Sequence, residues 1–229
     1  MTASRQSGTS LDDALDRLQH AHFYGEKLTP REQRALTRFI AERQGGPGAY
    51  AGSFALTAPE RKAGIRAFTG ELFTSASARH IAGEECCRVL ATLRGRDPRV
   101  ERALAAARGN LASRILPGVD ASPNAGAFCC GKCTVAFWRH IAAGGFNAPQ
   151  QRLAEGMRLL RSRRDGKGGW RRFPFYYTLL ALTEIGPGLA GHELKYASTV
   201  FKRRLARKPG PDKYARRRHD IMARAAAIV

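Results

Sequence analysis

The sequence predicts an all-α protein built from repeated helix pairs. Apolar residues recur at the spacing of an amphipathic helix through most of the 229 residues. Almost no stretch alternates between apolar and polar residues, so strands are not expected. Glycine and proline cluster between the periodic segments and mark where helices begin and end.

The first two helices have clear start signals. Residues 11–23 carry leucines on one face and follow Ser10, a residue type favoured at the N-cap. Thr29 caps a second helix that opens at Pro30 and runs to about residue 43.

The rest of the chain reads as loops and further helices. Residues 45–59 and 117–127 are rich in glycine and proline and are expected to be loops, and 60–72 fits either a short helix or an extended segment. Helices are expected over 75–94, 98–115, 129–143, 149–164, 174–185, 190–207 and from about 211 onward.

These elements suggest a simple organisation. We expect a flexible leader over 1–10, a helical-repeat domain over 11–208 and a basic C-terminal helix over 209–229. The chain has no apolar run long enough to cross a bilayer, so no integral membrane association is expected. The N-terminal residues have no apolar core of a secretory signal, so a cytoplasmic location is expected.

An internal repeat supports the helix-pair reading. Residues 38–50 (RFIAERQGGPGAY) align without gaps to 158–170 (RLLRSRRDGKGGW), with matching basic, apolar and glycine positions and an aromatic residue at the end. A looser match pairs 88–114 with 135–163. The offset of roughly 45 residues between the members of this looser match is typical of helix-pair repeats. Such repeats bury their apolar faces by stacking on neighbouring repeats.

The segment 159–182 (LLRSRRDGKGGWRRFPFYYTLLAL) resembles the repeat of the terpenoid cyclase and protein prenyltransferase superfamily, and 42–54 resembles the same turn. The resemblance implies an α/α toroid, with inner and outer helices around a central cavity, here as an incomplete toroid or curved arc. The catalytic motifs of the family, including the Asp-rich motif of the squalene-type cyclases, are absent from this chain. The resemblance therefore implies the fold and not an activity.

Two short motifs could form a polar site on the inner helices. His80, Glu84 and Cys87 share one helical face, and Cys130 and Cys133 share a face at the start of a later helix. Thiolate and imidazole ligands suit zinc, so His80, Cys87, Cys130 and Cys133 are candidate metal ligands. For catalysis the candidates are His80, Glu84 and Cys133. The alternative is that the cysteines only pack in the core.

The same residues permit two other interpretations. Cys129 lies near a helix N-terminus beside Lys132, which favours a reactive thiolate with His80 or His140 as its base. The acidic pair at 84–85 fits either acid–base chemistry or a salt-bridge network.

Aromatic residues offer candidate walls for a ligand cavity. Trp138, Tyr176 and Tyr177 are the candidate ligand-binding residues, and ordinary packing between stacked helices is the alternative.

The charge is the strongest feature of the composition. Lysine and arginine number 39 against 19 acidic residues, giving a formal net charge of +20. Such a field attracts polyanions, and the surplus is concentrated near the C-terminus. The candidate polyanion-binding residues are Lys202, Arg203, Arg204, Arg207, Arg216, Arg217 and Arg218.

Two functions remain open from sequence, and the sequence does not decide whether the protein is an enzyme. The first is a toroid-like protein with zinc that binds or transforms a small anionic or isoprenoid-like ligand between its inner helices. The second is a helical-repeat module that binds nucleic acid or another polyanion through its basic outer face and C-terminal helices. Convergence of the polar residues on a concavity would favour the first.

Overall fold

The computed structural model describes residues 9–93, 97–121 and 126–229, and most of the expected 1–10 leader lies outside these residues. The all-α prediction is confirmed, since the described residues form helices with one small two-stranded sheet. The long helices are α1 (Leu11–Tyr24), α2 (Pro30–Ala41), α4 (Ser75–Thr92), α5 (Pro98–Asp120), α6 (Gly131–Ala142), α7 (Pro149–Ser162), α8 (Phe175–Ile185), α9 (Pro187–Leu205) and α10 (Lys213–Ile228). The short elements are η1 (Tyr50–Gly52), α3 (Ala58–Ala63), β1 (Ile65–Arg66) and β2 (Leu72–Phe73).

Side-chain caps set several helix starts, as the sequence indicated. The Ser10 hydroxyl accepts the backbone N–H of Asp13 at 3.1 Å, and the Thr29 hydroxyl accepts that of Glu32 at 3.1 Å. Asp97 caps α5 in the same way. Each cap satisfies an N–H that has no partner within the helix.

Two sequence expectations differ from the structure. Helix α5 continues to Asp120 instead of ending near residue 115, because Ile115 and Val119 extend its buried stripe. Pro117 is tolerated within the last turn. In addition, strands are not expected from the sequence, but β1 and β2 form a short antiparallel pair, with β1 inside the segment 60–72.

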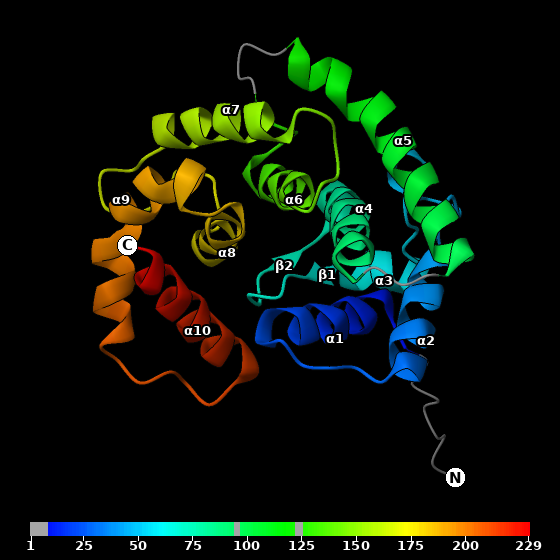
Figure 1. Ribbon diagram of the computed structural model, residues 1–229, viewed down its shortest axis with the longest axis horizontal. Coiled ribbons are helices and arrows are strands. Elements are labelled where there is room, and N and C mark those ends of the chain that lie inside the picture. The colour runs from blue at the N-terminus through cyan, green and yellow to red at the C-terminus, as the bar shows by residue number, and fades with distance from the viewer. Residues whose placement is uncertain (1–8, 94–96, 122–125) are drawn as a thin grey trace.

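The helix pairs stack so that one member lies inside and the other outside. Helices α4, α6 and α8 pack side by side, and each is followed by its outer partner, α5, α7 or α9. Helix α1 packs on α4 and α10 packs on α8, so these five helices surround the middle of the molecule (Figure 1). Side chains join α10 to α1: Arg217 pairs with Asp16, and Tyr24 donates to Asp220 at 2.6 Å.

Residues near the C-terminal ends of the five inner helices line one pocket of about 250 Å³, and every one of the five helices contributes to it. The residues are His22, Arg88, Thr92, Arg139, Ala142, Ala143, Thr183, Glu184 and Arg224. The C-terminal ends of these helices therefore meet at one place in the molecule.

The two copies of the sequence repeat each form a β-bridge from the same matching position, although the residues they reach do not match. Gln44 forms a β-bridge with Phe54, and Arg164, at the matching position, forms one with Trp170. Gly48 and Gly168, which also match, both have positive φ, at 81° and 87°. Such φ values favour glycine, so the repeat records a shared backbone turn.

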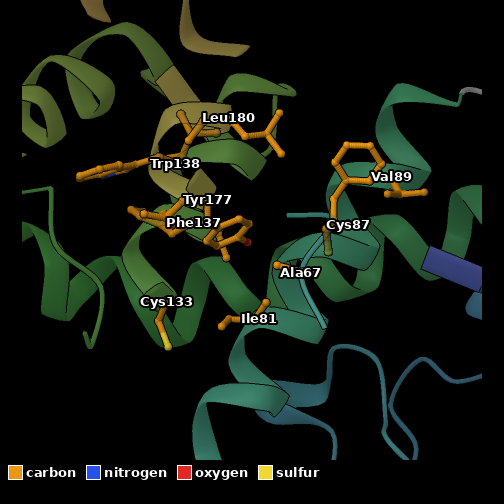
Figure 2. Close-up of a cluster of buried hydrophobic side chains, with 14 of the residues drawn as sticks. Ala67, Ile81, Cys87, Val89, Cys133, Phe137, Trp138, Tyr177 and Leu180 are labelled. Carbon is orange, nitrogen blue, oxygen red and sulfur yellow. The ribbon is translucent and has the colours of Figure 1, made fainter. Parts of the chain in front are cut away.

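A buried ion network joins the three inner helices α4, α6 and α8. Arg139 pairs with Glu85 of α4, and its Nε lies 2.7 Å from Glu184 Oε2 of α8. Arg88 Nε lies 2.9 Å from Glu85 Oε2, and the Tyr177 hydroxyl donates to Glu85. Apolar side chains of α4, α6 and α8, some of which are shown in Figure 2, pack around it.

Replacing Arg139 by methionine should destabilise the protein by roughly 3–5 kcal/mol, because the buried Glu85 and the partly buried Glu184 both lose a partner. Urea unfolding measures the change. Arg102→Met is the matched control, since Arg102 is exposed on α5. An unfolding midpoint of Arg139→Met equal to that of the control would contradict this role.

Stability should fall in acid through Glu184. Burial raises the pKa of Glu184, but Arg139 and Arg88 outweigh burial and lower it to about 2. A lowered pKa contributes stability above the unfolded-state pKa, and roughly 3 kcal/mol should be lost as pH falls from about 5 towards 2. Urea unfolding across this range should show a shallower decline for Glu184→Gln. The profile of Glu101→Gln, an exposed control, should match the wild type.

Candidate metal centre and anion pocket

His80 in the second turn of α4 lies close to Cys133 in the first turn of α6 and to Cys129 just before α6. The ligand atoms of His80, Cys129 and Cys133 all lie within 4.8 Å of one another, and His80 Nδ1 is 3.7 Å from Cys133 Sγ. Imidazole nitrogen and thiolate sulfur are ligands for transition metals. This cluster could therefore hold a metal ion.

The chain before α6 presents its sulfur atoms through an unusual backbone. Cys129 has a φ of +56°, a left-handed value that costs energy for a residue with a side chain. Cys130 follows as the N-cap of α6, and its Sγ lies 3.6 Å from that of Cys133. Such strain is often found at functional sites.

Local charges set the ionisation of these groups. Burial, together with Arg79 and Arg114, lowers the pKa of His80, which keeps the imidazole neutral and able to bind a metal at neutral pH. Burial raises the pKa of Cys133, and the nearby Cys130 raises it further. Burial also acts on Cys130, but the Cys133 N–H and the Lys132 charge outweigh it and lower the pKa.

A basic pocket of about 380 Å³ adjoins the cysteines, at the N-terminal end of α6. Cys129 and Cys130 line it. Among the described residues of its wall, four are basic and none is acidic; these four are Lys132, Arg163, Arg171 and Arg172. Leu159, Phe173 and Pro174 add an apolar side. The positive end of the α6 dipole strengthens the preference for an anion.

Close backbone contact holds this pocket together. A Cβ built on Gly131 would lie 2.1 Å from the carbonyl oxygen of Arg172, so only glycine allows the turn to approach the start of α6. Arg172 itself has a φ of +67°. The Gly-Gly-Trp turn between α7 and α8 therefore ends directly against the start of α6.

Of the candidate catalytic residues, the structure brings together His80 and Cys133 but not Glu84. Glu84 Oε2 lies 2.6 Å from His140 Nδ1, and both side chains are fully buried. Arg108 Nε donates to the other ring nitrogen of His140. Glu84 thus belongs to a buried chain between α4, α6 and α5, and its neighbour Glu85 to the central ion network.

Cys87, Trp138 and Tyr177 lie in the core. Cys87 lies away from Cys133 in Figure 2, and burial raises the pKa of its thiol well above the usual value. Trp138 Nε1 donates to the Gly126 carbonyl at 2.8 Å. Tyr177 bonds Glu85. Trp138 and Tyr177 thus have hydrogen-bond partners within the fold, and the Cys87 side chain is fully buried.

The basic C-terminal residues divide by exposure. Lys202, Arg203, Arg207 and Arg216 are exposed, and Arg204 and Arg218 are partly buried beside Tyr176. Arg217 is buried and paired with Asp16, so its charge is already used within the fold.

Sequence reasoning missed parts of the site. Cys129 was considered as a nucleophile and not as a metal ligand, although it is the first residue of the same CCGKC motif. The sequence analysis also did not name three arginines that line the basic pocket, namely Arg163, Arg171 and Arg172. Their position on either side of the Gly-Gly-Trp loop could have indicated them.

No helix among the described residues is long and apolar enough to cross a membrane. The resemblance to the toroid superfamily stays a prediction. No protein-family model, no curated protein and no solved structure matches this chain.

Proposed function

We propose that the protein binds zinc through His80, Cys129 and Cys133 and holds a small anionic ligand in the adjoining pocket. The observation that carries this proposal is the convergence of the three ligand atoms, from α4, from α6 and from the residue pair just before α6, beside a wall of four basic side chains. The cluster of ligand atoms alone does not specify a ligand, and neither does the basic wall. Together they indicate a metal ion with an anionic ligand bound beside it.

The donor set favours zinc. Two thiols and one imidazole suit a borderline-soft cation. Ligands about 2.0–2.3 Å from a tetrahedral zinc lie roughly 3.3–3.8 Å from each other. The 3.7 Å between His80 Nδ1 and Cys133 Sγ falls in this range. Zinc would displace the thiol protons of Cys129 and Cys133.

Three protein ligands leave a fourth position for the anion. Arginine binds phosphate or carboxylate through two parallel hydrogen bonds, and three arginines reach this pocket. Its apolar side, with Leu159 and Phe173, suits a short hydrocarbon portion. A zinc ion with an open coordination position would act as a Lewis acid and polarise an oxygen atom of the bound ligand.

Purified protein should contain one zinc per chain by elemental analysis. Cys133→Ser should lose the zinc, because it removes a ligand at the centre of the cluster. Cys130→Ser is the matched control and should keep it, since Cys130 is assigned no bond to the metal. Full thermal stability without zinc, or equal zinc loss in both variants, would exclude this assignment.

Inorganic pyrophosphate is a suitable probe of the pocket. Arg171→Ala/Arg172→Ala should weaken its binding about 10-fold or more, because hydrogen bonds to charged groups contribute roughly 1.5–3 kcal/mol each. Isothermal titration calorimetry measures the change. The control Arg31→Ala/Arg102→Ala removes the same charge from exposed sites elsewhere. Equal binding by the two double variants would argue against the pocket.

A further inference from the structure

A second basic pocket, of about 440 Å³, lies between the start of α8, the end of α9 and α10. Its wall contains Tyr176, Arg204, Arg207, Lys208, Arg218 and His219. No aspartate or glutamate is among the described residues that line it. It shares no lining residue with the pocket beside the cysteines.

The charge of this pocket is not neutralised within the fold. In the part of the chain that the structure describes, Arg204, Arg207, Lys208 and Arg218 form no ion pair. The neighbouring Arg217 differs, because it pairs with Asp16. Helix α10 therefore has one neutralised side facing α1 and one free basic side facing the pocket.

Two of these arginines are held in place. Arg204 lies over the rings of Phe175 and Tyr176, at 4.6 and 5.2 Å. Arg218 lies 5.0 Å from the Tyr176 ring centre, and its Nε donates to the Thr69 carbonyl at 2.7 Å. Their side chains lose little freedom when an anion binds, which raises affinity.

The basic surface extends well beyond the pocket. Residues 195–229 contain two acids, Asp212 and Asp220. The same stretch contains eleven basic residues: Lys195, Lys202, Arg203, Arg204, Arg207, Lys208, Lys213, Arg216, Arg217, Arg218 and Arg224. A single small anion would use only part of this surface, so the ligand that fits is a chain of negative charges.

We propose that this pocket and the exposed basic residues around it bind the phosphate backbone of single-stranded nucleic acid. A recess admits one flexible phosphodiester chain more readily than the convex surface of a duplex. A membrane is a poorer fit, because the apolar residues Ile221, Met222 and Ala225 of α10 are buried in the fold. Contacts to phosphates alone carry no base preference, so binding is independent of sequence.

Fluorescence anisotropy with labelled oligo-dT tests the proposal. Arg207→Ala/Lys208→Ala removes two exposed charges that form no ion pair within the described fold. Affinity should fall, and the slope of log affinity against log salt should shrink by about 1.4, since each single-strand phosphate contact contributes roughly 0.7. The control Arg31→Ala/Arg102→Ala, with the same net charge, should keep the wild-type slope.

Four results would overturn the proposal: no binding of oligo-dT at low salt; equal loss of affinity in the control variant; tighter binding of a duplex of the same length; or binding of anionic vesicles without binding of oligo-dT. Zinc content does not enter this test, and neither double variant changes a cysteine or His80. The outcome is therefore independent of the metal assignment.

Discussion

The buried pairing of Arg139 with Glu85 and Glu184 is the constraint on which the rest of the structure depends. It joins α6 to α4 and to α8 and so fixes the positions of the three helices relative to one another along their axes. His80 precedes Glu85 by five residues and Cys133 precedes Arg139 by six. At about 1.5 Å per residue, these intervals place the imidazole and the thiol at nearly the same level. The approach of His80 to Cys133 thus follows from an ion network less than two turns away.

The pocket at the C-terminal ends of the inner helices and the pocket at the N-terminal end of α6 differ in chemistry. Arg88, Arg139 and Arg224 lie near C-terminal ends, where the helix dipoles favour cations. The thiols and the basic pocket lie at the start of α6, where the dipole favours thiolate and anionic ligands. A ligand that needs both a soft metal and an anion site is therefore expected at the N-terminal end alone.

Local signals in the sequence predicted the fold better than the site. Caps and prolines gave the helix starts, and the match of 38–50 with 158–170 anticipated two loops that both close with a β-bridge. Helical spacing placed Glu84 and Cys87 on the same face of the helix as His80. It could not show that the three side chains have different surroundings: His80 lies beside Cys133, Glu84 bonds His140, and Cys87 is buried in the core. The partner of Glu84 is His140, 56 residues away, and such pairings follow only from the packing of α4 against α6.

We infer that the packing of α4 against α6 brings His80, Cys129 and Cys133 together as a zinc centre. X-ray absorption at the zinc edge of the purified protein tests this directly. Two sulfur ligands at about 2.3 Å and one imidazole are expected, with a light atom in the fourth position. A shell of oxygen and nitrogen only, or four sulfur ligands, would contradict it.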